Sequence, residues 1–442
     1  MGIDKVYNPN EIENKWLKKW DKENLFKSVP DEREAYTIVI PPPNVTGILH
    51  MGHMLNNTIQ DILIRRARLK GLNACWVPGT DHASIATEAK VVKMLKEKGI
   101  KKSDISRDEF LTYAWDWTEK HGGLILNQLK RIGCSCDWDR TKFTLDSDLS
   151  ESVIDTFIKL FDEGYLYRDK KIVNWDPEAL TTLSNEEVIY KEEETKLFYL
   201  KYQIVDSKDY LTVATTRPET IYGDTAVAVN PDDNRYKNLK NKKLIVPLVG
   251  REVPIVFDNS VEIDFGTGCL KVTPAHSEKD FIIGKNNELE IIDIFNDDAT
   301  INHHGKKYQA LDRFEAKKQI VNDLTEQGLI SKTESYTHNI ALSERTNSVV
   351  EPKLSLQWFI KMKKIAEPAI DAVVSGDIKF YPKKYINTYK NWMENIRDWN
   401  ISRQLYWGHR IPVYYLKNDN SKFVVSKNVK DALVKFKSKF NI

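Results

Sequence analysis

The sequence predicts an α/β protein in which a domain built on a parallel sheet is interrupted by an inserted β-rich domain. A chain of 442 residues exceeds one ordinary domain, so two or three domains are expected. Residues Thr37–Ile40 are β-branched throughout, which is typical of a buried strand in a parallel sheet, and a loop and an amphipathic helix follow them. Residues 190–340 instead alternate apolar and polar side chains between frequent turn signals, which indicates a separate β-rich domain.

Composition and charge describe an ordinary globular protein. Hydrophobic residues make up 41% and charged residues 29% of the chain, and the net charge is +2. A polyanionic partner would have to meet local basic stretches, each of which is by itself more often a solvated helix face: residues 65–70, 93–102 and 379–390. Because the sequence contains no apolar signal region or membrane span, we expect a cytoplasmic protein with no membrane partner.

The cysteines do not form a metal-binding pattern. Cys134-Ser135-Cys136 lacks the two-residue gap of a zinc knuckle, and no second cysteine pair lies near it. We therefore expect no bound metal, and free buried thiols at the four cysteines: Cys75, Cys134, Cys136 and Cys269.

The first expected element is an amphipathic helix over residues 10–26. Asn10 is a plausible N-cap, and Ile12, Trp16 and Trp20 share one face. We interpret this helix as an arm packed on the first domain.

The strand Thr37–Ile40 is followed by a segment whose composition suits phosphate binding. Prolines 41–43 end the strand, and a turn containing Gly47 and Gly52 leads into a helix. The apolar side chains of that helix, at three-to-four spacing, are expected to face the sheet: Leu55, Ile59, Ile62 and Leu63. Unpaired N–H groups and the helix dipole at such a helix N-terminus favour an anion.

Two histidines flank Gly52 in this segment. His50 and His53 are three residues apart, so in a helical turn both imidazoles can point at one group. A lone histidine is more often a surface or core residue. We favour a phosphate contact because the pair follows a strand and the loop PPPNVTG, while Gly52 lets a flat ring approach the backbone.

A second strand, Ala74–Val77, is expected after a helix stop at residues 71–73. Asp81 follows this strand on the side where ligands bind in open α/β sheets, and its carboxylate could pair with an ammonium group. Asp81 could equally be the N-cap of a helix beginning near Ser84. Helices are expected over residues 107–131, with Trp115 and Trp117 in the core, and over residues 149–164.

Within the β-rich region, strands are expected over residues 197–202 and 210–214. Two threonine-containing segments stand out, TTRPET at residues 215–220 and GTGCLKVTPAH at residues 266–276. Taken alone, such strand ends are usually plain β-surface.

The sequence HMGH after PPPNVTG resembles the ATP-binding signature of the class I aminoacyl-tRNA synthetases, in the form carried by the valine-specific branch. The resemblance implies a Rossmann-type nucleotide-binding domain and the substrates ATP, with Mg²⁺, and valine. It implies that His50 and His53 are catalytic and stabilise the transferring phosphate. The ATP-binding residues would be Gly47, His50, Gly52 and His53. The valine-binding residues would be Pro42, Asn44, Asp81 for the α-amino group, and Trp407 against the side chain, although Trp407 could also be core packing.

The β-rich region is similar to the editing domain inserted in the same family, which hydrolyses mischarged aminoacyl-tRNA. The resemblance implies one wall that holds the terminal adenosine and positions water, formed by Thr215, Thr216, Arg217 and Thr220. The opposite, catalytic wall would contain Lys271, Thr273 and Asp280, with Asp280 anchoring the amino group. Ser277 departs from the family, in which aspartate is common at this position, so its role is open. A valine-shaped pocket rejects the added hydroxyl of threonine only weakly, so such a second site is needed.

The resemblance covers nearly all 442 residues, which correspond to the first half of a full synthetase. The second ATP signature (KMSKS) and the anticodon-binding domain have no counterpart, so we expect weak or absent aminoacylation by this chain. Alternatives are a stand-alone editing deacylase and a non-catalytic fragment that binds valine, adenylate or tRNA ends. We expect a monomer that meets the acceptor end of tRNA(Val). The expected parts are a helical arm (1–35), the first half of the Rossmann domain (36–147), a connective segment (148–189), the editing domain (190–340), a return segment (341–385) and the start of the second, incomplete Rossmann half (386–442).

Overall fold

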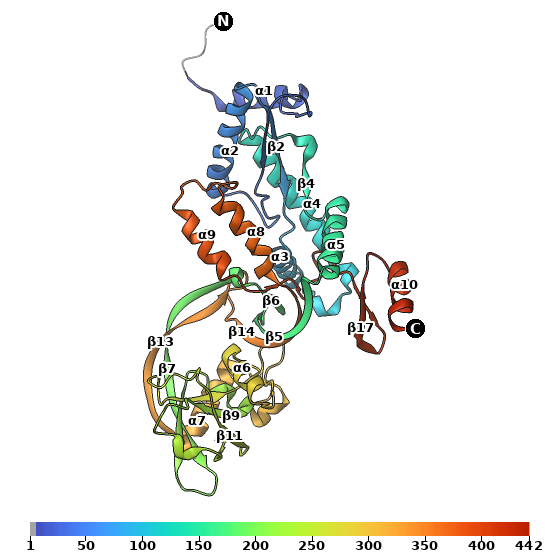
Figure 1. Cartoon of the computed structure of the whole chain (residues 1–442). Helices are drawn as coiled ribbons and strands as arrows, with labels where there is room; N and C mark the ends of the chain where they lie inside the picture. Colours follow the sequence, from blue (N-terminus) through green and yellow to red (C-terminus); the bar gives the residue numbers. More distant parts are fainter. Residues whose placement is uncertain (1–5, 442) are drawn as a thin grey trace. The chain divides into compact units, whose positions relative to one another are not determined.

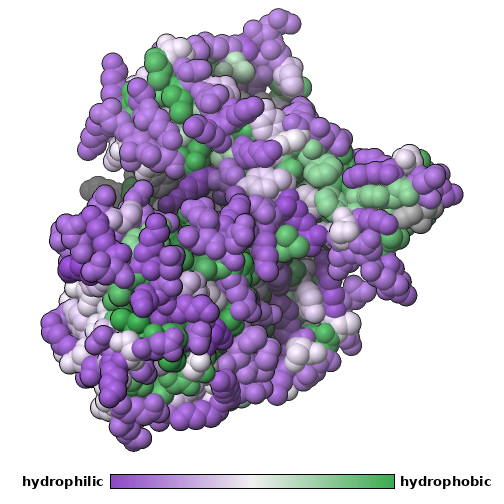
Figure 2. All heavy atoms as spheres, turned by 60° about the horizontal axis from the view of Figure 1, so that its bottom comes forward, coloured by the Kyte–Doolittle hydropathy of each residue, from purple (hydrophilic) through white to green (hydrophobic). Residues whose placement is uncertain are grey.

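A computed structural model describes residues 6–441 of the chain (Figure 1). The ends of the predicted arm and of the predicted last segment, residues 1–5 and 442, lie outside the described residues. The chain divides into two compact units, one with described residues 6–162 and 405–441 and one with residues 163–404. In the described part, no helix is both long and apolar enough to cross a membrane. Polar side chains cover most of the face in Figure 2, with smaller apolar areas among them.

The first unit contains the predicted parallel strands. β1 (Ala35–Val39) pairs in parallel with β2 (Asn73–Val77), and α2 (Met51–Leu69) connects them. A second parallel pair is formed by β3 (Gly79–Thr80) and β4 (Lys142–Phe143). The other elements of this unit are α1 (Pro9–Lys22), α3 (Ser84–Glu97), α4 (Arg107–Arg131), α5 (Ser147–Asp162), the antiparallel hairpin β16 (Val413–Leu416) and β17 (Asp419–Val425), and α10 (Val429–Phe440).

The prediction for the buried face of α2 is wrong. The apolar stripe is exposed, with Leu55 at 66% and Ile62 at 61%, whereas Asn57, Ile64 and Ala67 are the buried residues of the helix. Periodicity identifies an apolar stripe but not which neighbour covers it, and the buried face combines one polar, one large apolar and one small side chain. In keeping with this, Gln60 accepts a hydrogen bond from the Trp76 indole. Leu63 and Ile59 are exposed as well.

Strand β1 is also less buried than predicted. Its side chains alternate between half-buried and exposed, and Val39 is 70% exposed. Only β2 pairs with it among the described residues, so one face and one edge lack a neighbour. Ile40, just beyond the strand, is buried in a core that includes Trp76, Ile125 and Leu129.

The N-terminal helix packs on this unit as predicted, but its start differs. α1 begins at Pro9 with Asn8 as N-cap, so Asn10 lies inside the helix. Proline is favoured in the first turn because its missing N–H would be unpaired there. The Arg65 guanidinium lies over the Trp20 ring at 5.1 Å, and Lys130 pairs with Asp21 at 3.4 Å, which ties the arm to α2 and α4.

The region predicted to contain helices over residues 107–131 is one helix, α4, which starts with a capping box between Ser106 and Glu109. The core prediction is wrong for Trp115, which is 47% exposed. Trp117 is partly buried and donates its indole N–H to the Val45 carbonyl at 3.0 Å. Trp115 fails as a core residue because the buried face of α4 consists of Phe110, Ala114, Thr118, Gly122, Ile125 and Leu129.

The second unit contains two sheets. The larger, seven-stranded sheet has the order β12-β9-β11-β10-β7-β13, with β8 paired to β7, and the smaller has the order β15-β14-β5-β6. β7 and β13 of the larger sheet are long and curved, and they extend from the rest of that sheet toward the smaller one (Figure 1). The strands of the two sheets are β5 (Leu166–Asp176), β6 (Thr181–Leu183), β7 (Val188–Ile204), β8 (Tyr210–Thr215), β9 (Ala226–Val229), β10 (Lys243–Ile245), β11 (Glu252–Phe257), β12 (Cys269–Val272), β13 (Ile330–Ser343), β14 (Glu351–Ile360) and β15 (Trp399–Asn400). The helices are α6 (Glu278–Asn286), α7 (Arg313–Glu326), α8 (Met362–Val374) and α9 (Tyr385–Glu394).

All four cysteines carry free thiols. Cys134, Cys136 and Cys269 are buried, but Cys75 is only partly buried, so the prediction of buried thiols is wrong for Cys75. Burial raises the pKa of the Cys134 thiol to about 12, which keeps this thiol protonated.

Candidate functional site

The two histidines of the first unit form the start of α2. His50 is the N-cap, and its Nδ1 accepts the Gly52 backbone N–H at 3.1 Å, while His53 Nδ1 accepts the His50 N–H at 3.2 Å. This reciprocal arrangement is a capping box built from imidazoles. The ring centroids lie 4.0 Å apart, so the structure brings the two rings together as the spacing predicted.

The capping box fixes which ring nitrogens are free. Because Nδ1 of each ring accepts a backbone N–H, a neutral imidazole must carry its proton on Nε2. Burial and the neighbouring His50 lower the pKa of His53, which favours the neutral form. A Cβ on Gly52 would lie 3.0 Å from Cε1 of His50, so a side chain there would displace the ring. The helix start therefore offers two Nε2–H donors that can bind an anion.

The loop after β1 lies beside the segment after β2. The Asp81 backbone N–H donates to the Pro43 carbonyl at 2.8 Å, and Asn44 and Asp81 form a parallel β-bridge. Asn44 is partly buried, Pro42 is exposed, and Gly47 has open space around it. The structure thus brings Asn44 and Asp81 together, as the predicted amino-acid pocket requires.

Asp81 does not cap α3. The N-cap of that helix is Ala83, which has a left-handed backbone and no capping side chain. Oδ1 of Asp81 instead accepts from the Ala83 N–H and from the Thr144 hydroxyl, both at 3.1 Å. Burial alone would raise the pKa of Asp81, but hydrogen bonds from His82 and Ala83 outweigh it and lower the pKa, so the carboxylate is ionised at neutral pH. An ionised, half-buried carboxylate can hold an ammonium group.

Trp407 is buried in the same unit. Its side chain is 1% exposed, packs with Phe110, and donates Nε1–H to the His82 carbonyl at 2.9 Å. The backbone N–H groups of Tyr406 and Trp407 both donate to Oε2 of Glu88, at 2.8 and 2.9 Å. Trp407 is therefore fixed next to the residues around Asp81, and it also serves core packing.

Glu88 was not found in the sequence as a site residue. It is 3% exposed, on α3, and its second oxygen pairs with Lys102. No local pattern distinguishes Glu88 from the other polar residues of α3, because the two backbone N–H groups that it accepts lie more than 300 residues further along the chain.

In the second unit, the predicted residues Lys271 and Thr273 belong to a buried polar cluster around Asp224. Oδ1 of Asp224 accepts from Lys271 Nζ and from the Thr273 hydroxyl, both at 2.7 Å. Oδ2 accepts from the Tyr202 hydroxyl at 2.6 Å, and Asp224 is fully buried. Asp224 was not predicted as a site residue.

Asp280 lies next to this cluster. Its Oδ2 accepts the Thr273 backbone N–H at 2.9 Å, and burial raises its pKa. Ser277 is the N-cap of α6 and accepts the Asp280 backbone N–H at 3.3 Å. Ser277 thus has a capping role, which answers the question that its departure from the family left open.

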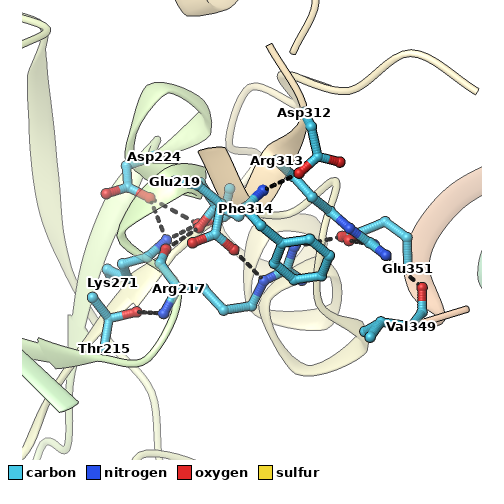
Figure 3. A network of polar contacts seen from close by, with 12 residues as sticks. Thr215, Arg217, Glu219, Asp224, Lys271, Asp312, Arg313, Phe314, Val349 and Glu351 are labelled. Carbon is cyan, nitrogen blue, oxygen red and sulfur yellow. Dashed lines mark hydrogen bonds and ion pairs between the residues drawn. The ribbon is translucent and has the colours of Figure 1, made fainter. Parts of the chain in front are cut away.

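The residues of the other predicted wall surround Arg217. The Arg217 backbone N–H donates to Thr215 Oγ1, and the Thr220 hydroxyl donates to the Arg217 carbonyl, both at 3.0 Å. Thr216 between them is partly buried. The Arg217 side chain pairs with Glu219 at 2.9 Å (Figure 3).

The two walls lie close together. A Cβ on Gly223, in the 3₁₀ turn Pro218–Gly223, would lie 2.9 Å from Cγ2 of Thr273. Burial, and the positive charges of Arg217 and Lys271, lower the pKa of His276 well below its usual value. Figure 3 shows Lys271 and Asp224 beside Glu219 and Arg217. The structure therefore brings the two segments that carry the predicted hydrolytic residues close together, and what these residues do stays a prediction.

Residues 15–440 match the sequence profile of the class I tRNA synthetases (I, L, M and V). The chain belongs to this family, and its fold is the predicted Rossmann-type domain with a β-rich insertion. Similar relatives are valine–tRNA ligases of Christiangramia forsetii (59% identical over 98% of this chain and 50% of the relative), Bacteroides fragilis (60%, over 98% and 49%) and Carboxydothermus hydrogenoformans (51%, over 94% and 47%). The chain spans about half the length of these relatives. In a comparison of structures, 95% of this chain aligns with 52% of a chain in the Agrobacterium radiobacter K84 LeuRS–tRNA–LeuAMS complex, at 16% sequence identity and a TM-score of 0.43.

Proposed function

We propose that this chain carries the valine-activating and editing sites of a valine–tRNA ligase. The observation that carries the proposal is the buried cluster of Lys271, Thr273 and Asp280 beside Arg217. These polar groups lie in the segments for which the resemblance to the editing domain predicts hydrolysis. The names of the relatives, about 60% identical along almost the whole chain, support the same function.

In the activation step, the valine carboxylate attacks the α-phosphate of ATP. An O–P bond forms to give valyl-adenylate, and the bond to the β-phosphate breaks to release pyrophosphate. The Nε2–H groups of His50 and His53 donate to phosphate oxygens, and the N-terminus of α2 adds its positive dipole end. Asp81 holds the valine ammonium. The terminal ribose hydroxyl of tRNA(Val) then attacks the carbonyl carbon. An ester bond forms, the bond from that carbon to the phosphate oxygen breaks, and AMP leaves with the hydroxyl proton.

Mg²⁺ is proposed to enter with ATP. Among the residues that the structure describes, no three His, Cys, Asp or Glu side chains gather to hold a metal ion. The donors at the site suit phosphate oxygens, since the imidazole Nε2–H groups are hydrogen-bond donors. When bound, Mg²⁺ neutralises part of the phosphate charge.

In the editing step, water attacks the ester carbonyl of threonyl-tRNA(Val). A C–O bond forms to the water oxygen, the bond to the ribose oxygen breaks, and a proton passes to that oxygen, so free threonine leaves. Asp280 holds the threonine ammonium, while Lys271 and Thr273 form the polar side of the pocket. Thr215, Thr216, Arg217 and Thr220 hold the terminal adenosine and position the water.

The test is hydrolysis of threonyl-tRNA(Val) by this chain, with valyl-tRNA(Val) as the control substrate. Selective release of threonine, lost in Asp280→Ala and kept in Asp264→Ala, supports the editing function, since Asp264 is an exposed acid of the same region. A folded chain without selective hydrolysis contradicts it.

Activation is tested separately by valine-dependent exchange of pyrophosphate into ATP. His50→Asn should abolish any exchange, because asparagine has no group at the position of Nε2. Exchange that persists in this variant contradicts the proposed role of His50. Binding of valyl-adenylate without turnover in either assay would favour the non-catalytic alternative.

A further inference from the structure

A carboxylate outside the β-rich region holds one of the side chains proposed to bind substrate. Nη2 of Arg217 donates to Oε1 of Glu351 at 2.6 Å, in addition to the hydrogen bond from Nε to Glu219. Glu219 belongs to the turn that follows Arg217. Glu351 instead starts β14, 134 residues further along the chain, in the smaller sheet of this unit.

Glu351 is itself fixed by a second arginine. Nη1 of Arg313 donates to the other Glu351 oxygen at 2.6 Å, and Nη2 of Arg313 donates to the Val349 carbonyl, also at 2.6 Å (Figure 3). The side chains of Arg313 and Glu351 are 6% and 4% exposed. Each carboxylate oxygen therefore accepts from a different guanidinium, and Glu351 cannot rotate without breaking buried, charge-assisted hydrogen bonds.

This arrangement leaves one edge of Arg217 available. A guanidinium has five N–H donors, and Arg217 uses one on Nε and one on Nη2 for the two glutamates. The side chain is still 32% exposed, and its guanidinium lies 5.8 Å from the Phe295 ring centroid. Two arginines and two glutamates also balance in charge. Arg217 therefore offers directed N–H donors rather than a net positive field.

We propose that Glu351, oriented by Arg313, is a positioning residue for Arg217 in the editing reaction. The inference rests on the proposed editing function and extends its site beyond residues 190–340 into the sheet that carries β14. Glu351 does not touch the substrate. It holds the N–H donors of Arg217 in the orientation in which they bind the terminal adenosine of the tRNA. The long Arg217 side chain is therefore already ordered before the tRNA binds.

The test is steady-state hydrolysis of threonyl-tRNA(Val) by the whole chain carrying Glu351→Gln. The amide keeps the size of the side chain but loses the charge, and its NH₂ group faces an arginine donor. Within the wall of Thr215, Thr216, Arg217 and Thr220, the inference assigns the nucleoside to Arg217 and the water to the threonine hydroxyls. We therefore expect KM to rise by about tenfold or more and kcat to change by less than about threefold. The matched control is Glu344→Gln, a 43% exposed glutamate paired with Arg345, which should leave both constants unchanged.

A second comparison separates positioning from a general structural effect. In an Arg217→Lys background, Glu351→Gln should add less than about a twofold change, because a residue that acts through Arg217 has no effect once that guanidinium is gone. If the effects of Arg217→Lys and Glu351→Gln on KM multiply in the double variant, the inference is wrong. It is also wrong if Glu351→Gln alone has the wild-type KM. If Glu351→Gln does not fold, Glu351→Asp keeps the charge with a shorter reach and should raise KM likewise. An inactive wild-type chain overturns the proposed function itself, whereas an active wild-type chain with an unaffected variant overturns only the role of Glu351.

Discussion

Replacing Asp224 by asparagine isolates the contribution of one buried negative charge to the stability of the second unit. The fully buried carboxylate accepts hydrogen bonds from Tyr202, Lys271 and Thr273 at 2.6 to 2.7 Å. Asparagine has nearly the same size. Its oxygen can still accept from Lys271 and Thr273, and its NH₂ group can donate to the Tyr202 oxygen. The hydrogen bonds can therefore persist while the charge disappears.

The cost comes from the Lys271 ammonium, which is left without its charged partner. The Lys271 side chain is 7% exposed, and Asp224 is the carboxylate with which it forms an ion pair. Removing one partner of a buried pair costs about 3–5 kcal/mol, because the remaining charge is neither hydrated nor neutralised. Since the asparagine retains hydrogen bonds, we expect the lower end of this range, about 3 kcal/mol at neutral pH.

Hydrogen exchange followed by mass spectrometry measures this loss within the unit, at the backbone amides of β8 and β12. Asp224→Asn should speed exchange there by about 150-fold, which corresponds to about 3 kcal/mol. Asp264→Asn, an exposed acid, should leave exchange unchanged. A variant that also carries Lys271→Met should regain most of the protection, because no unpaired charge remains. A loss below about 1 kcal/mol, or no recovery in the double variant, would refute the charge argument.

Three further predictions concern His50, Asp280 and Glu88. His50→Asn keeps an N-cap side chain and should preserve stability, whereas His50→Ala should lower the free energy of unfolding by about 1 kcal/mol. Urea denaturation measures both variants, and equal stability of the two would contradict the capping role. Burial raises the pKa of Asp280, so its ionised form destabilises the folded state above that raised pKa. Asp280→Asn should therefore be more stable than wild type at pH 7, and this difference in stability should vanish as the pH falls to the ordinary aspartate pKa. Thermal melts that show a difference independent of pH would refute this prediction. Glu88→Ala removes the acceptor of the partly buried Tyr406 N–H and of the buried Trp407 N–H, and should speed hydrogen exchange there at least about tenfold. Unchanged exchange would show that Glu88 does not hold this segment.

What the sequence predicted correctly about the first unit came from contiguous patterns. The strand, loop and helix around His50 follow from β-branched residues, prolines and helical spacing, and the two rings meet because residues three apart share a face. The buried face of α2 was not predictable in this way. Leu55 and Ile62 form the more apolar stripe, yet Ile64 and Ala67 pack on the sheet, since which face is covered depends on tertiary neighbours.

The hydrolytic site shows the same division more sharply. Thr215, Arg217 and Thr273 stand in two threonine-containing segments, and the resemblance of these segments to the family's editing domain predicts them as site residues. Glu351 has no such signal, because its link to Arg217 depends on the fold of the 134 residues between them, including the long pairing of β7 with β13. A buried arginine needs a carboxylate partner, but the sequence offers many. The groups that would face a ligand can therefore be read from local motifs, whereas the groups that hold them in place emerge only from the three-dimensional structure.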